Sequence, residues 1–304
     1  MVGNGERGFK SVEGLRSRTT LDLSRVVARF KSRYRLDDLL ACVGLARSTF
    51  YYHYQRRNRP EKHLRLRKVI RAVFYQAKGR YGHRRIRLSL QSQGWRVSKK
   101  LVAKLMKLEG LKSFRRPKRY NSYQGTLSRI CGNILKRDFA ASKPNRKWVS
   151  DITEFRVAGQ KVYLSPVIDL YDHAVIAYTA GLSPSTALSA SSLKNAIDKE
   201  KPEPGLIVHT DQGFHYQHSS WRHQLEKLGA IQSMSRKGNC YDNSIAENFF
   251  SHLKVEFYHQ ETFKTIDQFI RQLDEYITWY NTARIQEKLE GMSPAQYRTH
   301  ALTA

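Results

Sequence analysis

The spacing of apolar residues changes along the chain, from a helical period in the front part to a strand period behind it. In the front part, apolar positions recur every three or four residues, as at Leu36, Leu39 and Val43. This spacing predicts short amphipathic helices that each bury one face. From Trp148 the apolar residues run together or alternate, and this pattern predicts β-strands. We therefore expect an all-α region followed by a domain with a mixed α/β sheet.

The helical region contains two pairs of short helices, each separated by glycine. In the first pair, Gly44 follows the helix that holds Leu36 and Val43, and a second helix begins at Arg47. Such a pair resembles a helix-turn-helix, whose second helix would present Arg47 and Ser48 to DNA. A plain helical hairpin with a solvated face is the alternative interpretation.

The second pair ends in a strongly basic helix. Ser98 is in position to cap this helix at its start. The exposed face carries Lys99, Lys100 and Lys104, whose point charges suit DNA phosphates. A solubilising basic face is the alternative, but such a face normally includes acids, and the surrounding segment has almost none.

The excess positive charge lies entirely in the front of the chain. Residues 1–139 hold 36 Lys and Arg against 8 Asp and Glu, whereas residues 140–304 hold 18 of each. A net charge of +28 on a chain with 40% hydrophobic residues indicates a folded protein that binds a polyanion. The pattern and the charge together predict four parts: a basic leader at 1–34 that we expect to be mobile, a helical DNA-binding region at 35–112, a basic linker at 113–139, and the α/β domain with its C-terminal helices at 140–304.

Membrane-inserted and secreted classes are excluded by the same pattern. No apolar run approaches the roughly 18 residues that a spanning helix needs, and the N-terminus has no apolar signal core. The cysteines, Cys42, Cys131 and Cys240, are scattered singly, so no disulfide framework is expected. We therefore expect a cytoplasmic protein that binds nucleic acid and no membrane.

Three acids in the second half have positions that suit a metal site. Asp151 and Asp211 fall at predicted strands and Glu247 falls on a predicted helix, with 35 residues between Asp211 and Glu247. Hard carboxylate oxygens hold Mg²⁺ and leave positions for phosphate and water. Two such ions, about 4 Å apart, can activate a hydroxyl and stabilise a leaving oxygen in phosphoryl transfer. Taken singly, each acid is more simply interpreted as a surface group, and the trio becomes persuasive through its local sequences.

Those local sequences are distinctive. The acids lie in residues 148–153 (WVSDIT), 209–213 (HTDQG), and 233–243 (SMSRKGNCYDN) followed by 247–250 (ENFF). Further segments are residues 47–52 (RSTFYY), 79–85 (GRYGHRR), 162–170 (VYLSPVIDL) and 291–297 (GMSPAQY). Together, from Leu36 to Tyr297, they closely resemble the second-frame (OrfB-type) product of bacterial insertion-sequence transposases, the DDE class with a retroviral-integrase-like catalytic core. Gln286 departs from the pattern, because many relatives have His there.

The resemblance implies a ribonuclease-H-like core in which Asp151, Asp211 and Glu247 are the catalytic residues and the metal ligands. It implies Mg²⁺ as the cofactor, with Mn²⁺ as a substitute. Lys254 lies seven residues after Glu247, so both face one side of the helix, where the lysine would hold a DNA phosphate. The matching loop and helix start add further DNA contacts in the family's pattern, at Lys237, Asn239 and Asn243.

The resemblance also implies an activity, partners and a location. The activity is that of a DDE transposase/integrase, a polynucleotidyl transferase that cleaves and joins DNA at the ends of an insertion sequence, in DNA transposition, integration and recombination. The partners are double-stranded DNA of the element ends and the target, further copies of the chain on DNA, and an upstream-frame protein or a frameshift fusion. The location is the bacterial cytoplasm, at the nucleoid when DNA is bound.

Two alternatives remain open at this point. One is a non-catalytic DNA-binding regulator derived from a transposase frame, which would need the basic half alone. The other is a nuclease of the same fold that cuts RNA. The intact acids favour an enzyme over the regulator, because a retired active site would be free to lose them, and the resemblance argues against the nuclease that cuts RNA.

Overall fold

The computed structural model describes residues 19–57, 62–114, 131–236 and 240–303. Contacts divide the chain into two compact units, residues 1–65 and residues 66–304, and each unit is described by itself. The single helical region predicted at 35–112 is therefore wrong as a structural unit. The two predicted helix pairs build separate cores, because the apolar stripe of each pair is satisfied by its own neighbours.

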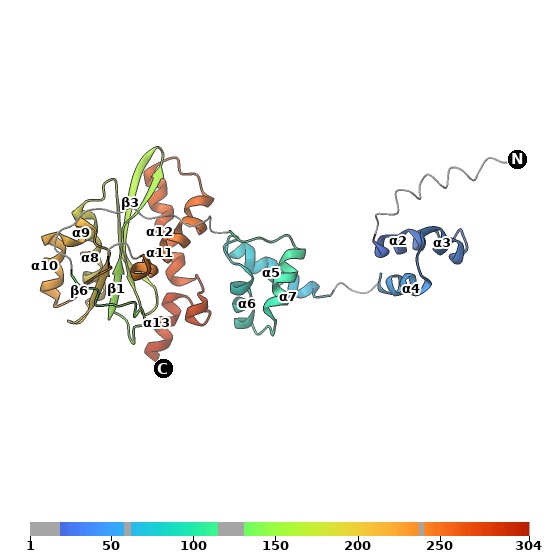
Figure 1. Cartoon of the computed structure of the whole chain (residues 1–304), viewed down its shortest axis with the longest axis horizontal. Coiled ribbons are helices and arrows are strands. Elements are labelled where there is room, and N and C mark those ends of the chain that lie inside the picture. Colours follow the sequence, from blue (N-terminus) through green and yellow to red (C-terminus); the bar gives the residue numbers. More distant parts are fainter. Residues whose placement is uncertain (1–18, 58–61, 115–130, 237–239, 304) are drawn as a thin grey trace. The chain divides into compact units, whose positions relative to one another are not determined.

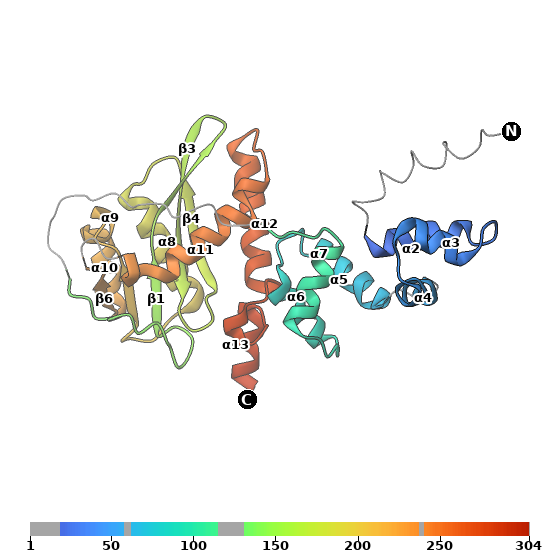
Figure 2. The ribbon, with the colours of Figure 1, turned by 45° about the vertical axis from the view of Figure 1, so that its right-hand side comes forward.

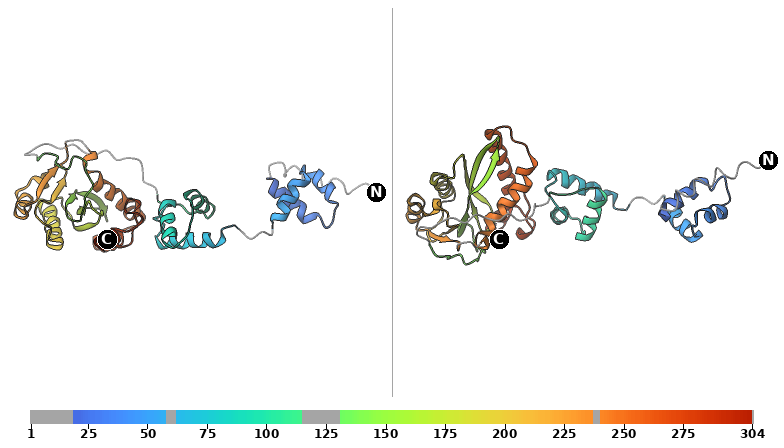
Figure 3. Two further views of the ribbon diagram at one scale, coloured as in Figure 1. Left: turned by 90° about the horizontal axis from the view of Figure 1, so that it is seen from below. Right: turned by 45° about the horizontal axis from the view of Figure 1, so that its top comes forward.

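The first unit is a small cluster of three helices, α2 (Thr20–Phe30), α3 (Leu36–Val43) and α4 (Arg47–Arg56). Its core consists of Val27, Leu40, Leu45 and Phe50. Figure 3 shows the three helices together, in blue. Gly44 ends α3 with a φ of 64°, a left-handed conformation that glycine adopts without a Cβ clash. The predicted helix-glycine-helix arrangement is confirmed.

The expectation of a mobile leader at 1–34 is wrong for its second half. Residues 20–30 form α2, capped by the Thr19 side chain, which accepts a hydrogen bond from the backbone of Asp22. Val27 is buried in the unit's core, with Leu23 packed against it. The reason is the four-residue spacing of these two side chains, which turns one helical face towards α3 and α4. Residues 1–18 lie outside the described part of the chain.

The second unit begins with three further helices, α5 (Leu64–Gln76), α6 (His83–Ser92) and α7 (Lys99–Leu108). They enclose a core that includes Ile70, Ile86, Leu90 and Val102. Ser98 caps α7 as predicted, because its hydroxyl accepts a hydrogen bond from the backbone N–H of Leu101 at 3.2 Å.

The predicted linker at 113–139 ends earlier than expected. Residues 115–130 lie outside the described part of the chain. The remainder belongs to the α/β domain, since Leu135 is buried in its core and Arg137 donates a hydrogen bond of 2.8 Å to the buried Asp242. The basic composition of this segment concealed these contacts, which are made with residues about a hundred positions later.

The α/β domain has a six-stranded mixed sheet, and the predicted fold class is confirmed. The strands are β1 (Lys147–Ser150), β2 (Thr153–Val157), β3 (Gln160–Asp169), β4 (Val175–Gly181), β5 (Ile207–Thr210) and β6 (Ile231–Met234). Their order is β2-β3-β1-β5-β6, and β4 pairs with β3. The first four strands pair antiparallel, whereas β1, β5 and β6 run parallel to one another. The parallel pair β1 and β5 positions the site described below.

Helices cover both faces of the sheet (Figures 1 and 2). On one face lie α8 (Thr186–Glu200), α9 (Phe214–Gln217) and α10 (Ser219–Leu228), around a core that includes Trp148, Val208 and Trp221. On the other face lie α11 (Ser244–Glu256) and α12 (Ile266–Thr282), which pack on strand residues such as Val149 and Phe155. The chain continues through the short segment η4 (Glu287–Leu289) to α13 (Pro294–Thr303).

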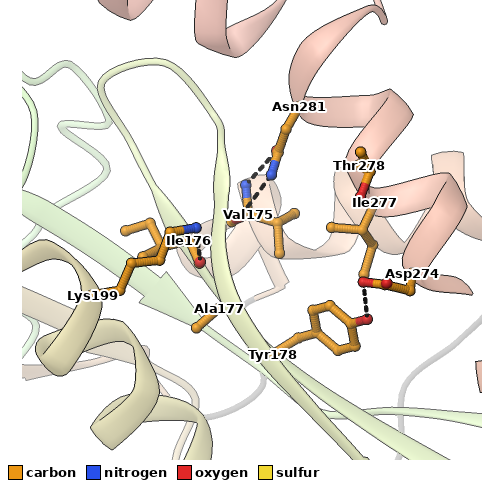
Figure 4. A pocket seen from close by; sticks show the side chains of 9 residues that line it. All are labelled: Val175, Ile176, Ala177, Tyr178, Lys199, Asp274, Ile277, Thr278 and Asn281. Atoms are coloured by element: carbon orange, nitrogen blue, oxygen red, sulfur yellow. Dashed lines mark hydrogen bonds between the residues drawn. The ribbon is translucent and has the colours of Figure 1, made fainter.

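The end of α12 is fastened to the edge strand β4 (Figure 4). The amide side chain of Asn281 accepts a hydrogen bond from the backbone N–H of Val175 and donates one to its carbonyl, both at 2.9 Å. Tyr178 donates to Asp274 at 2.9 Å beside a small pocket of about 280 Å³. The two hydrogen bonds of Asn281 occupy backbone groups of Val175 that an edge strand would otherwise expose. Within the described residues, no helix is long and apolar enough to cross a membrane.

Candidate active site

Two of the three predicted acids lie side by side at one edge of the sheet. Asp151 directly follows β1 and Asp211 directly follows β5. The two strands are parallel and hydrogen-bonded, and their register pairs Val149 with His209. Two residues further along each strand come the two aspartates. The carboxyl ends of adjacent parallel strands therefore bring residues 60 positions apart in the sequence into one site.

Each aspartate is held by a backbone hydrogen bond at its strand end. One oxygen of Asp151 accepts from the N–H of Ile152, and one oxygen of Asp211 accepts from the N–H of Gly213, each at 2.8 Å. A Cβ on Gly213 would lie 2.9 Å from that oxygen of Asp211 and 2.9 Å from the ring of His215. Glycine at this position therefore lets the backbone approach the carboxylate closely.

The third acid, Glu247, is carried by the first turn of α11. Its neighbours Ala246 and Phe250 are buried against the sheet, and Glu247 itself is on the exposed side. Glu247 nevertheless acts electrostatically on Asp151, so the helix brings it towards the two aspartates.

The pKa values of these acids reflect burial and mutual repulsion. Burial raises the pKa of Asp151 well above its ordinary value, and the negative charges of Asp211 and Glu247 raise it further. Burial also raises the pKa of Asp211 and that of Glu247. None of the three forms an ion pair with Lys or Arg within the described residues. A cation placed among them would relieve this repulsion.

The oxygen donors of the site fit a hard divalent cation, but only two of the three acids are already close together. Asp151 and Asp211 offer oxygen ligands of the kind that such ions prefer. Across the described ranges, however, no three His, Cys, Asp or Glu side chains are gathered closely enough to hold a metal. The two aspartates thus form the preassembled part of the site, and Glu247 would have to approach them to complete it.

Lys254 lies on α11 beyond Glu247, as its spacing predicted. Its ammonium group is 5.6 Å from the centre of the Phe155 ring. Burial lowers the pKa of Lys254, while the charges of Glu154 and Asp151 raise it. A positive charge therefore faces the site without being neutralised by a direct ion pair in the described residues.

The loop residues predicted to touch DNA have different positions. Lys237 and Asn239 lie outside the described residues. Asn243 is only 5% exposed, and neither of its side-chain amide atoms has a hydrogen-bond partner of normal length within the described part. Its amide is near enough to Asp151 to lower the pKa of that carboxyl, against the larger effect of burial. Asn243 therefore faces the acids rather than an open surface.

The predicted DNA-binding residues of the helical regions are exposed. Arg47 and Ser48 lie at the start of α4, where Arg47 forms an ion pair of 2.9 Å with Asp37. The basic face of α7 is exposed, as predicted, because the opposite face of the helix is buried. It carries Lys99, Lys100 and Lys104. Lys99 lies 3.4 Å from Glu287.

Sequence reasoning missed a tyrosine beneath the aspartates. Tyr216 is fully buried, its hydroxyl lies 3.4 Å from that of Ser150, and its pKa is raised by burial and by the charges of Asp151 and Asp211. It also packs against Trp221. The aromatic residues after Gly213 are the one sequence signal for a buried element there. The residue spacing does not connect Tyr216 with Asp151.

Comparison with protein families identifies the class of this domain. Residues 141–240 match an integrase core domain family, and residues 247–302 match a second integrase core domain family. Residues 61–119 match an HTH-like domain family, which includes the second of the predicted helix-turn-helix candidates. The α/β domain with the paired aspartates is thus an integrase core, preceded by a helix-turn-helix-like region.

Curated relatives define the family more narrowly. The chain is 41% identical over 274 residues to the putative transposase InsK of insertion element IS150 from Escherichia coli K12, covering 90% of this chain and 97% of the relative. It is 32% identical over 283 residues to the transposase InsF of IS3A from the same organism, covering 91% and 98%. The chain belongs to the family of insertion-sequence transposases, as the sequence motifs predicted.

Solved structures with a similar fold are more distant. The magnesium complex of the HTLV-2 integrase catalytic core domain, in its trimeric form, matches with a TM-score of 0.39 and 16% identity, over 52% of this chain and 98% of that one. A simian T-cell lymphotropic virus intasome in complex with a PP2A regulatory subunit matches with a TM-score of 0.46 and 16% identity, over 69% of each chain. Similarity at this level supports no conclusion about the site.

Proposed function

We propose that this chain is a metal-dependent DNA transposase that cleaves strands at the ends of an insertion sequence and transfers them to other DNA. The observation that carries the proposal is the pair Asp151 and Asp211 at the ends of adjacent parallel strands, with Glu247 on the helix beside them. Membership of the transposase family supplies the class of reaction.

Asp151, Asp211 and Glu247 are the catalytic residues in this proposal, and they would hold Mg²⁺, or Mn²⁺ in its place. The bound ions would activate the attacking hydroxyl and stabilise the leaving oxygen of the strand. The protein's own contribution is positioning. The backbone N–H groups of Ile152 and Gly213 each donate a hydrogen bond to one carboxylate oxygen, of Asp151 and Asp211 respectively, and so fix the two side chains at the strand ends.

Lys254 binds a DNA phosphate beside the acids in this proposal. It stands on the same helix as Glu247 and its charge faces Asp151. A lysine there would attract the backbone of the strand and offset part of the repulsion between phosphate and carboxylates. Lys237 and Asn239 would contribute further contacts near the start of α11, and Asn243, which is buried beside Asp151, would meet only DNA that has reached the acids.

The helical regions would supply most of the affinity for double-stranded DNA. Arg47 and Ser48 on α4 and Lys99, Lys100 and Lys104 on α7 are exposed and basic or polar. Contacts of this kind to phosphates are independent of sequence and weaken as salt rises. We further propose that the chain acts as an oligomer on the element ends and target, with an upstream-frame protein or as a frameshift fusion, in the bacterial cytoplasm.

Cleavage of end DNA tests the proposal. The full chain, or its fusion, is incubated with Mg²⁺ and duplex DNA from the ends of its own element, and nicked strands are separated on a denaturing gel. Glu247→Gln keeps the size of the side chain but removes its charge, and should reduce cleavage at least about 10³-fold, because several kcal/mol of transition-state stabilisation are lost.

Glu226→Gln on α10 is the matched control, since Glu226 is an exposed acid on the other side of the sheet, and it should cleave like the wild type. Undiminished cleavage by Glu247→Gln would refute the assignment of this acid. Salt-sensitive DNA binding without any metal-dependent product would instead identify a non-catalytic regulator.

A further inference from the structure

A second polar pocket, separate from the aspartates, lies within the larger unit. Its volume is about 430 Å³. Five parts of the chain contribute to it: α6 with the residue before it, α11, the segment that leads from α12 through η4, and the single residues Ser113 and His173. The side chains that matter here are Arg84 and Arg85 from α6, Asn248 from α11, and Arg284, Glu287 and Lys288 from the third segment.

The pocket carries an excess of positive charge. Two of its four cations, Arg85 and Arg284, are neutralised in part by the buried Glu256, to which they donate hydrogen bonds of 2.8–3.0 Å. Among the described residues that line the pocket, the acid is Glu287, and Glu256 lies next to the lining arginines. Four cations therefore face two carboxylates, so the pocket attracts an anion.

The other two cations are weakly engaged. Arg84 is 65% exposed, and its contact with Glu287 is long, at 3.5 Å. Lys288 lies 3.4 Å from Nε2 of the buried His173. Burial first, and the charge of Lys288 second, lower the pKa of His173 to about 4, so this imidazole is neutral at pH 7 and adds no charge of its own to the pocket. Both cations can turn to a ligand without losing a strong ion pair.

The backbone at the start of α6 adds to the positive electrostatic potential of the pocket. Gly82 lines the pocket and is the N-cap of α6, where it provides no side chain for capping. The first N–H groups of a helix have no partner within the helix, and the dipole gives this end a partial positive charge. The pocket thus combines two available cations with a helix end of the same sign.

The position of the pocket relates it to the acids. Asn248, which lines the pocket, directly follows Glu247 on α11. His252, one turn further along the helix, lines it too. An α-helix rises about 1.5 Å per residue, so this span of five residues covers about 7.5 Å. The pocket therefore lies within two helical turns of Glu247 along α11.

We propose that this pocket binds a backbone phosphate of DNA, a few nucleotides from the phosphate that meets Asp151, Asp211 and Glu247. The inference rests on the proposed function, because it takes the strand at the acids to be DNA. Arg84 and Lys288 make the contacts, and Glu287 opposes them. The pocket therefore couples the helix-turn-helix-like region to the path of the cleaved strand.

Equilibrium binding in EDTA tests this without requiring cleavage. The full chain is titrated into a fluorescent mixed-sequence duplex at several salt concentrations, since phosphate contacts do not depend on sequence. Arg84→Ala and Lys288→Ala should each weaken binding about tenfold and reduce the slope of log K against log salt by about 0.9. Lys227→Ala, an exposed lysine on α10, is the control and should change neither quantity.

A substitution that should strengthen DNA binding provides a second test. Glu287→Gln releases Arg84 and Lys99, which lie 3.5 and 3.4 Å from its carboxylate, and should tighten DNA binding several-fold more than the control Glu226→Gln. All of these positions are exposed, so the variants should keep the wild-type circular dichroism spectrum and melting temperature.

The outcomes separate this inference from the proposed function. Unchanged salt slopes in Arg84→Ala and Lys288→Ala, or an equal change in Lys227→Ala, would overturn the pocket even if cleavage by the wild type were observed. Reduced slopes together with an absence of cleavage in Mg²⁺ would support the pocket and count against the enzyme. Binding of inorganic phosphate that these substitutions abolish, with no effect on DNA, would show a free-anion site and overturn the assignment to DNA.

Discussion

Helix α11 carries two glutamates whose surroundings are opposite. Glu256, at its end, is 4% exposed and receives two hydrogen bonds of 2.8 Å from Arg284, one of 3.0 Å from Arg85 and one of 3.1 Å from Tyr276. Although burial acts to raise its pKa, the two arginines and His252 together lower it to about 2. Glu247, at the start of the helix, has a raised pKa and stands near two further acids with raised pKa values.

The difference separates a carboxylate that stabilises the fold from the carboxylates to which the proposed function assigns catalysis. An acid whose charge is matched by fixed arginines holds elements together, and Glu256 connects α6, α11 and the segment after α12 in this way. Acids that repel one another in a partly buried site destabilise the fold unless a cation arrives. A fold keeps such an arrangement where function requires it, and the Asp151 site fits that description.

The largest expected effect on stability comes from the paired acid. Glu256→Gln leaves Arg284, whose side chain is 1% exposed, without its carboxylate. The free energy of unfolding should fall by about 3–5 kcal/mol, as measured by urea denaturation. Glu203→Gln is the control, because Glu203 is 69% exposed and pairs with Lys143 at the surface, and it should cost at most about 1 kcal/mol. If the free energy of unfolding fell no further in Glu256→Gln than in the control, the contrast between Glu256 and Glu247 would be contradicted.

Acid titration tests whether the pKa of Glu256 is lowered in the folded chain. The pKa of Glu256 is about 2 in the folded chain and 4.5 ordinarily. A lowered folded pKa means that the stabilisation is complete above pH 4.5 and is lost as the pH falls towards 2, by roughly 3 kcal/mol in total. The unfolding free energy of the wild type should therefore fall more steeply than that of Glu256→Gln over this window. Parallel curves would contradict the pairing.

The smallest expected effect concerns the unpaired acids. Mg²⁺ at ten times its dissociation constant should stabilise the wild type by about 1.4 kcal/mol, measured as a rise in melting temperature at constant ionic strength. Asp151→Asn should remove this rise and, without metal, should be at least as stable as the wild type, because a repulsion is gone. Glu226→Gln should keep the full response. An equal rise in Asp151→Asn would show that the ion binds elsewhere.

Much of the site could be predicted from the sequence because its signals are local. The strand ends at Asp151 and Asp211, the amphipathic helix with Glu247, and the Ser98 cap are properties of short windows. The helix of residues 20–30 was missed for a related reason, because its short apolar stripe lies beside a segment without clear periodicity and gains its core only from α3 and α4.

Other features depend on contacts between distant windows. Nothing near Glu256 in the sequence marks it as a buried ion-pair partner, and this role appears only when Arg85, 171 residues earlier, is brought against it. Asn243 was expected to touch DNA from a loop, yet packing buries it beside Asp151.

The sequence by itself determined the division of charge, the family motifs and the identity of three acids, since these depend only on residue type and spacing. The tertiary structure decided which carboxylates are paired and which are not. The reason is that a pKa depends on burial and on charges within a few ångströms, and those neighbours come from strand register and helix packing. The same holds for the basic pocket, whose walls come from five segments that no local pattern connects.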